Sequence, residues 1–199
     1  MIAREAFWYL VPLLIVAALM QFVNHFYSIP FWLLAIVVAY LFRNPTYEYS
    51  EAALGIVSPV DSVVTHVSKE KDPYIDREAV RIEFEMGVMD PYILRSVTEG
   101  KIANFWMTQS SVENKNKVKA IRIQTDEGDE AIMEVHPSRS GQTMCYYAAG
   151  ERVGQGKKCG FLPFGSKVVV YLPENSVVEV HEGDHVKAGR DIIAHWPRS

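Results

Sequence analysis

The feature that most constrains this chain is an uncharged apolar run, FWYLVPLLIVAALMQFV, at residues 7–23. A second apolar run, FWLLAIVVAYLF, covers residues 31–42, and the connection between the runs holds polar Asn24 and His25 and the helix-stopping Pro30. Aromatic residues cluster at the ends of both runs, as they do at membrane interfaces. The first run is close to bilayer-spanning length and the second is shorter. We predict a membrane-anchoring hydrophobic helical hairpin over residues 1–45, with a buried helical pair as the alternative.

The charges that flank the hairpin predict its orientation. Arg4 precedes the first run and Arg43 follows the second, so the positive-inside rule places both ends on the cytoplasmic side. Arg4 and Glu5 ahead of the run, with no small-residue cleavage site after it, argue against a secreted signal peptide. We therefore predict that the protein lies at the cell membrane with its remaining domain on the cytoplasmic side.

The composition changes from residue 56 onward. Short alternating segments such as AVRIEFEM, KVKAIRIQT and KVVVYLP are separated by turn signals such as DEGD and EGDH, and no long helical period appears. This pattern predicts one mainly β domain over residues 46–199. The net charge of −4 and the lack of a basic stripe argue against a nucleic-acid partner. The two cysteines and six histidines show no metal-ligand spacing, so we predict no metal site.

A weak internal repeat, G-x-x-V-x-x-G, occurs in AGERVGQGKKCGFL at 149–162 and in EGDHVKAGRDIIAH at 182–195. Paired units of this form make the tight turns of a sandwich-like or barrel-like fold, and we expect Gly150, Gly156, Gly183 and Gly189 to adopt positive φ. The hairpins resemble those of biotinyl and lipoyl carrier domains. A carrier needs an exposed lysine flanked by methionines, and no such tripeptide is present, so a carrier function is the least supported interpretation.

The segment FLPFGSKVVVYLP at 161–173 contains the pair Gly165–Ser166 just before a β-branched run. A glycine–serine pair is usually a turn. The alternative is a bond that the protein cleaves in itself: the Ser166 hydroxyl attacks the Gly165 carbonyl, and β-elimination of the resulting ester leads to a pyruvoyl group. This chemistry requires a residue without a side chain before the serine, a nearby base and hydrogen-bond donors for the oxyanion.

Several further segments carry a resemblance to a known family. LFRNPTYE is similar to an FFRDPxR element, IVSPVDSVV to VSPADGKV, VENKN to NERN, and GFLPFGSKVVVYLP to the self-cleavage element GMIRFGSRVDxYLP. These elements occur in the family's order, after an opening IAREAFWYLVP that is similar to its AREG. The chain thus resembles the short-form phosphatidylserine decarboxylases, pyruvoyl enzymes of bacteria and archaea, along nearly its whole length.

The resemblance implies roles for specific residues. Ser166 would become the pyruvoyl cofactor, Gly165 would end the larger chain 1–165, and the smaller chain 166–199 would stay associated with it, in a possible homo-oligomer. Asp61, on the aspartate of the SPAD motif, would assist proton movement, although an aspartate there also serves as a turn cap. The substrate would be a serine phospholipid, phosphatidylserine or archaetidylserine, converted to the ethanolamine phospholipid and CO2, with the pyruvoyl group as electron sink.

The chain also departs from the family pattern. DPYILRSVTEG at 90–100 aligns with DVHVNRAPVxG, and Tyr92 stands where the family has a histidine. Tyrosine is a poor base at neutral pH but can donate a proton. One hypothesis is that His136 supplies the missing imidazole; the other is that it is merely a strand-end residue before Pro137. The alternative function is therefore a catalytically inactive membrane-anchored relative acting as a lipid-binding or scaffold protein.

Overall fold

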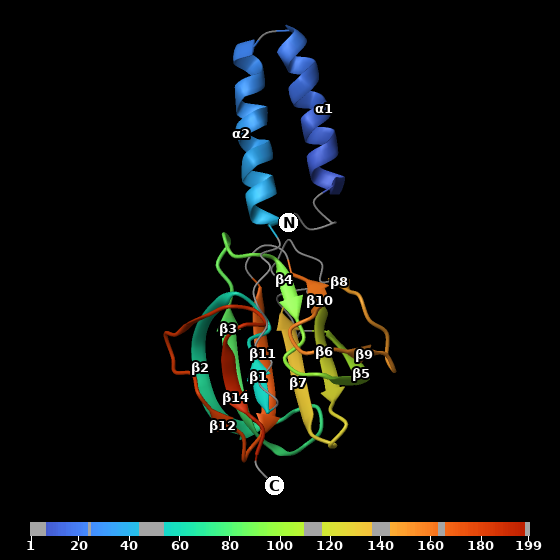
Figure 1. The fold of residues 1–199 in the computed structure, drawn as a ribbon, viewed down its shortest axis with the longest axis vertical. Helices are drawn as coiled ribbons and strands as arrows, with labels where there is room; N and C mark the ends of the chain where they lie inside the picture. Colours follow the sequence, from blue (N-terminus) through green and yellow to red (C-terminus); the bar gives the residue numbers. More distant parts are fainter. Residues whose placement is uncertain are drawn as a thin grey trace. The chain divides into compact units, whose positions relative to one another are not determined.

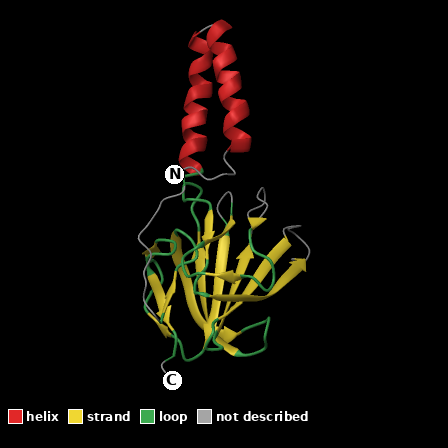
Figure 2. Ribbon diagram, turned by 45° about the vertical axis from the view of Figure 1, so that its right-hand side comes forward, coloured by secondary structure: helices red, strands yellow, loops and turns green. Residues whose placement is uncertain are grey.

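The computed structural model describes residues 7–23, 25–43, 54–109, 117–136, 144–162 and 166–197. The chain divides into two compact units, Met1–Thr46 and Tyr47–Ser199. The first unit is helical and the second consists of strands and connecting loops, as Figure 2 shows by colour.

The first unit is a pair of helices of 17 residues each, α1 (Phe7–Val23) and α2 (His25–Leu41). They run antiparallel, because the ring of Tyr9 near the start of α1 lies 5.4 Å from the ring of Phe42, just past the end of α2. The side chains buried in this unit recur at intervals of seven residues in each helix: Leu10 and Ala17 in α1, and Ser28, Ala35 and Phe42 in and after α2. Small residues on such a seam let two helix backbones approach closely.

The predicted connection between the apolar runs is wrong in one respect. Pro30 does not stop a helix but lies inside α2, which begins at His25. A proline in a helix removes one backbone hydrogen bond and clashes with the preceding turn. α1 likewise contains Pro12, so the continuous apolar sequence outweighs the local cost of proline in both helices.

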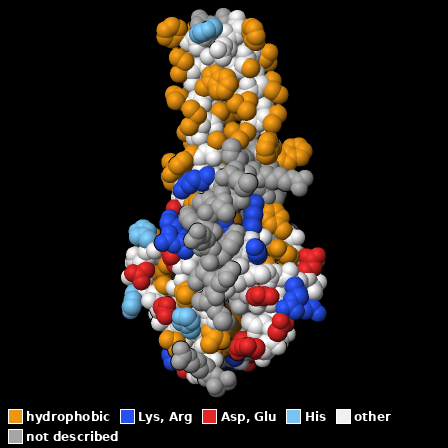
Figure 3. All heavy atoms as spheres, in the orientation of Figure 1, with side chains coloured by type: hydrophobic (Ala, Val, Ile, Leu, Met, Phe, Trp, Pro, Cys, Tyr) orange, Lys and Arg blue, Asp and Glu red, His pale blue; other side chains and the backbone are white. Residues whose placement is uncertain are grey.

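The rest of the helical surface is strongly apolar. Trp8, Phe22 and Phe26 are 85%, 92% and 80% exposed, and hydrophobic side chains cover the face of this unit seen in Figure 3. Among the described residues, neither helix reaches the length and hydrophobicity that a membrane crossing requires.

The second unit contains fourteen strands in its described residues: β1 (Gly55–Val57), β2 (Ser62–Lys71), β3 (Glu78–Glu85), β4 (Ile93–Arg95), β5 (Gly100–Gln109), β6 (Lys117–Gln124), β7 (Glu130–His136), β8 (Met144–Cys145), β9 (Arg152–Val153), β10 (Lys158–Phe161), β11 (Lys167–Pro173), β12 (Val177–Val178), β13 (His185–Val186) and β14 (Ile192–His195). The prediction of a mainly β domain is confirmed. Eight strands form one sheet in the order β13-β2-β3-β11-β7-β6-β5-β9, and two three-stranded sheets have the orders β1-β14-β12 and β4-β10-β8 (Figure 1).

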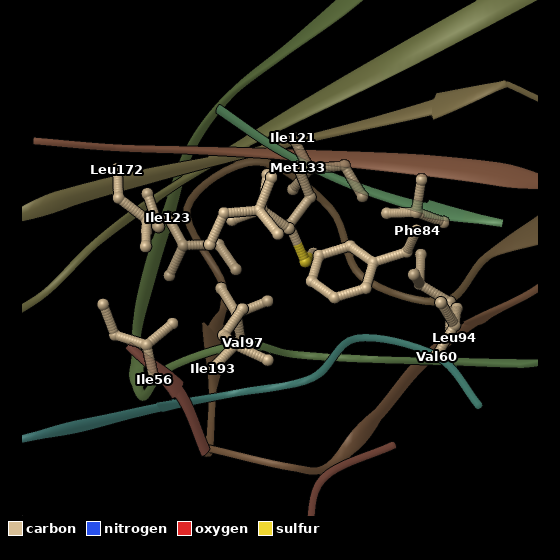
Figure 4. Close-up of a cluster of buried hydrophobic side chains, with 14 of the residues drawn as sticks. Ile56, Val60, Phe84, Leu94, Val97, Ile121, Ile123, Met133, Leu172 and Ile193 are labelled. Carbon is tan, nitrogen blue, oxygen red and sulfur yellow. The ribbon is translucent and has the colours of Figure 1, made fainter. Parts of the chain in front are cut away.

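The small sheets pack against one face of the large sheet. Side chains alternate along β11, so that Val168, Val170 and Leu172 enter the main core while Val169 and Tyr171 belong to a smaller cluster on the opposite face. Figure 4 shows the main core, in which Phe84 and Met133 of the large sheet lie among side chains from the small sheets and their connections, including Ile56, Val97 and Ile193. This layering is sandwich-like; the likeness to biotinyl and lipoyl domains stays a prediction.

The large sheet consists of two structurally matched halves. From the centre of the sheet outward, each half has equivalent strands in the same order. β2-β3 in one half corresponds to β5-β6 in the other, β13 to β9, and the central strand β11 to β7. The β2–β3 ladder is interrupted between Val64 and His66, and the β5–β6 ladder is interrupted at the matching place between Ile102 and Asn104. The small sheets match in the same way. One half comprises β1–β3 with β11–β14, and the other comprises β4–β10 and is inserted within it.

The predicted glycine repeat is part of this internal symmetry. Gly150 and Gly183 have φ of 94° and 93°, and Gly156 and Gly189 have φ of 67° and 71°, so all four positive φ values are confirmed. The hydrogen bonds match as well: the N–H of Gly156 donates to Ser96 O at 2.9 Å, and that of Gly189 to Ser58 O at 2.8 Å. The repeat therefore marks equivalent turns of the two halves.

Candidate active site

VENKN and most of LFRNPTYE lie outside the described residues. The strands that flank Asp61 and Ser166 meet at one end of the large sheet. β2 begins just after Asp61, β3 ends just before Met86, and β11 begins just after Ser166, and these three strands are consecutive neighbours. Two strand spacings put the backbones of β2 and β11 about 10 Å apart. The sheet topology thus places Asp61 and Ser166 at the same end of the large sheet.

Ser166 is buried, with 1% of its surface exposed. Its backbone carbonyl accepts a hydrogen bond from the N–H of Met86 at 3.1 Å, which extends the β3–β11 ladder by one pair. The alternation of β11, extended by one residue, places the Ser166 side chain on the core face with Val168. Gly165, the predicted partner of Ser166 in cleavage, lies outside the described residues.

The loop from Met86 to Tyr92 is fixed by its own hydrogen bonds. The N–H of Gly87 donates to Asp90 Oδ2 at 2.7 Å, and the N–H of Asp90 donates to Gly87 O at 3.2 Å. The buried Tyr92 donates its hydroxyl to Val88 O at 2.9 Å. We call residues 86–92 the bracket loop, because it also holds chain on both sides of residues 163–165.

The bracket loop binds both flanks of the predicted cleavage segment. Its first residue bonds Ser166, and at its other end the carbonyl of Tyr92 accepts the N–H of Leu162 at 3.0 Å. The ring of Tyr92 also lies edge-on to Phe161 at 6.1 Å between centroids. Tyr92 thus lies beside the predicted cleavage segment, and its hydroxyl donates to the backbone of its own loop.

Asp61 is a buried carboxylate whose partners come from the connection between β13 and β14. Its Oδ1 accepts the N–H of Ala188 at 2.8 Å, and Lys187 Nζ lies 3.6 Å from its Oδ2. Its exposed fraction is 2%. The matching residue of the other half, Glu99, is exposed. At this turn, only the half that contains Ser166 has a buried carboxylate. The same residue also connects the turn to the segment between β13 and β14.

His136 ends β7 next to the start of β11. It is the Cα partner of Lys167, and its Nε2 lies 3.2 Å from Glu134 Oε1. The alternation of β7 sends Val135 into the main core, so His136 faces the opposite side of the sheet. The structure brings His136 near Ser166 along the backbone but does not direct its side chain to the same face.

Two residues near the site, Lys167 and Arg95, were not predicted to be functional from the sequence. Burial lowers the pKa of Lys167, which directly follows Ser166, and the nearby charge of Arg81 lowers this pKa further. Arg95 is buried with 3% exposure and donates from Nη1 to Gly156 O at 2.9 Å. Its match to the family motif in DPYILRS was the only sequence signal for it. Within the described ranges, no three His, Cys, Asp or Glu side chains form a group that could hold a metal ion.

The fold and this site define a mainly β protein with a separate apolar helical unit and a buried serine held at the start of a central strand. The family model for phosphatidylserine decarboxylase matches residues 34–194. The chain belongs to this family, as the resemblance in its sequence predicted.

Curated relatives support the assignment over nearly the full length. The chain is 32% identical to the phosphatidylserine decarboxylase proenzyme of Aromatoleum aromaticum, covering 99% of this chain and 96% of the relative. It is 32% identical to the proenzyme of Nitrosomonas europaea and 33% identical to that of Burkholderia mallei, with 98% of this chain and 95% of the relative covered in each case. No solved structure gives a significant match.

Proposed function

We propose that this protein is a self-processing decarboxylase that converts the serine head group of phosphatidylserine to ethanolamine and releases CO2. The observation that carries the proposal is the buried Ser166, which follows a glycine in sequence and is held by the bracket loop at the start of a central strand. A turn that served only to connect two segments would not need this burial or these bonds to a distant loop. Family membership and the proenzyme names of the relatives support the same function.

Self-processing would break the bond between Gly165 and Ser166. The Ser166 hydroxyl oxygen adds to the Gly165 carbonyl carbon, the C–N bond breaks as the nitrogen takes up a proton, and an ester results. Loss of the Ser166 α-proton then expels the Gly165 carboxylate and leaves a dehydroalanine. Water adds to this group and ammonia leaves, which gives the pyruvoyl group. When present, this group supplies the electron sink for loss of CO2.

Asp61 is the residue we propose for proton movement in this sequence. It is a buried carboxylate at the same end of the large sheet as Ser166, and its contacts with Ala188 and Lys187 hold it in place. A carboxylate in such a setting can accept the hydroxyl proton or the α-proton if its oxygen reaches them. Tyr92, predicted from the sequence as a proton donor, is proposed here to act first through the bracket loop that its hydroxyl closes.

The two cleaved chains are expected to remain together. Cleavage would place β11–β14 in the smaller chain, and β11 is hydrogen bonded to β3 on one side and β7 on the other. Its buried Val168 and Val170 lie in the main core. Separation would expose this core and two strand edges, so the smaller chain should stay bound without a covalent link.

The helical unit is proposed to hold the protein at the membrane that contains its substrate. Its exposed Trp8, Phe22 and Phe26 are unfavourable in water and suited to a lipid environment. Arg4 and Arg43, which flank the apolar helices, favour placing the catalytic unit on the cytoplasmic side.

The test is denaturing intact-mass analysis of the purified protein beside Ser166→Ala and Asp61→Asn, together with CO2 release from phosphatidylserine vesicles. We expect two fragments from the wild type, the smaller beginning with a pyruvoyl group, no cleavage of Ser166→Ala, and strongly slowed cleavage of Asp61→Asn. A wild-type chain that stays intact and releases no CO2 would contradict the proposal and favour a lipid-binding scaffold.

A further inference from the structure

The hydrogen bond between Met86 and Ser166 has a matched counterpart in the other half of the sheet. There the N–H of Thr125 donates to Asp129 O at 2.8 Å and closes the short turn between β6 and β7. In both halves the acceptor follows a glycine in sequence, Gly128 or Gly165. The turn at Thr125 is a continuous short connection, whereas the whole inserted half separates Met86 from Ser166. The Met86 bond is therefore a tertiary contact that holds Ser166 where a hairpin would otherwise hold it.

The position of this bond relative to the cleavage chemistry is informative. Cleavage breaks the bond on the amino side of Ser166, whereas the carbonyl that Met86 binds lies on its carboxyl side. That carbonyl becomes the amide carbonyl next to the keto carbon of the pyruvoyl group. Resting on the proposed function, we infer that the Met86 amide is a positioning group that holds this carbonyl both before and after self-cleavage.

Such a donor has two physical consequences. It limits rotation of a residue that cleavage turns into a free chain end, and it draws electron density from the carbonyl beside the keto carbon, which makes that carbon more electrophilic. Met86 and Ser166 are 3% and 1% exposed, so water does not compete effectively for the bond.

The bracket loop keeps the donor in place after the chain is cut. Gly87 and Asp90 close the loop next to Met86, and the carbonyl of Tyr92 holds Leu162 on the other flank of the cleavage segment. Met86 stays in the larger chain while Ser166 begins the smaller one. The positioning group and the group it positions thus come from different chains of the processed protein.

The experiment removes the amide hydrogen with Met86→Pro in the full chain. Glu85, which precedes it, ends β3 in the extended conformation that a following proline requires. Met86→Ala keeps the N–H and measures the effect of losing the side chain alone. Thr125→Pro, compared with Thr125→Ala, is the matched control, because it removes the equivalent backbone bond in the other half without touching the site. The comparison with alanine accounts for loss of the Thr125 hydroxyl, which accepts the N–H of Asp129 at 3.0 Å.

Two rates are measured by mass spectrometry: chain cleavage, and capture of the keto group in cleaved protein by hydroxylamine. Relative to Met86→Ala, we expect Met86→Pro to slow both rates about 3- to 10-fold, as for loss of one buried hydrogen bond. Thr125→Pro should leave both rates within about twofold of those of Thr125→Ala. Equal rates for Met86→Pro and Met86→Ala would overturn the inference, as would equal slowing by Met86→Pro and Thr125→Pro.

If Met86→Pro does not fold, the α-hydroxy analogue of methionine at position 86 replaces the N–H with oxygen and keeps the side chain. The same slowing is expected, and wild-type rates would overturn the inference. A wild-type chain that never cleaves contradicts the proposed function and the inference together. A cleaving wild type with an indifferent position 86 contradicts the inference alone.

Discussion

His136 lies directly opposite Lys167 in the β7–β11 ladder, and Lys167 is the residue that follows Ser166. The side chain of His136 nevertheless contacts Glu134 on the face of the sheet opposite the main core. The backbone of His136 is therefore close to Ser166, but its side chain is not directed toward the Ser166 hydroxyl. The hypothesis that His136 supplies the imidazole that the family carries at position 92 needs the side chain to reach the core face, which this register does not favour.

We therefore expect His136→Ala to cleave and decarboxylate at close to the wild-type rates, with a loss of stability of about 0.5–1.5 kcal/mol from the missing bond to Glu134. Time-resolved cleavage and denaturant unfolding measure the two effects. Loss of cleavage in a folded His136→Ala protein would instead support the imidazole hypothesis.

Tyr92→Phe tests the bracket loop. The change keeps the buried ring against Phe161 and removes the hydroxyl bond to Val88. Loss of that bond should lower stability by about 1 kcal/mol. Because the bonds between Gly87 and Asp90 still close the loop, we expect cleavage within about threefold of the wild-type rate. A fall of a hundredfold or more in a stably folded variant would show that the hydroxyl donates a proton in the chemistry.

Glu134 predicts a pH dependence of stability. Burial alone would raise the pKa of Glu134, but the hydrogen bond and charge of His136, with hydrogen bonds from Tyr74 and Tyr171, outweigh it and hold the pKa below the ordinary 4.5. A depressed carboxyl pKa stabilises the fold above the unfolded value, and this stability is lost as the pH falls through the folded value.

Glu134→Gln should accordingly lower the free energy of unfolding by about 1–2 kcal/mol near pH 6. The difference from the wild type should shrink as the pH falls below 4.5, the ordinary value. Urea unfolding at a series of pH values measures it. Glu127→Gln is the control, since Glu127 is an exposed carboxylate in the turn between β6 and β7. A difference that stays constant down to strongly acidic pH would contradict the assignment.

Gly189 and Gly183 form a matched pair for testing the glycine turns. Both have positive φ, so alanine at either position is strained by about 1–2 kcal/mol. A Cβ at Gly183 meets nothing within 4 Å, whereas one at Gly189 would lie 2.9 Å from Arg95 Cδ and 3.1 Å from Gly156 Cα. Gly189→Ala should therefore be less stable than Gly183→Ala by about a further 1–3 kcal/mol, measured by thermal unfolding. Equal losses would contradict this packing.

Much of the protein was predictable from local sequence. The strand segments follow from the local alternation of apolar and polar residues. The four positive-φ glycines follow from the backbone freedom of glycine in short turns. The family motifs likewise indicated candidate functional residues, including Asp61 and Tyr92. Pro30 was predicted wrongly, because its local preference was outweighed by the apolar helix around it.

Tertiary structure decided the rest. No local signal pairs Met86 with Ser166, places Ala188 on Asp61, or turns His136 away from the core, because each depends on strands brought together from distant parts of the chain. The sequence by itself determined the strand segments, the turn glycines and the family to which the chain belongs. The insertion of one half of the sheet within the other, driven by burial of a shared core, decided what surrounds Ser166.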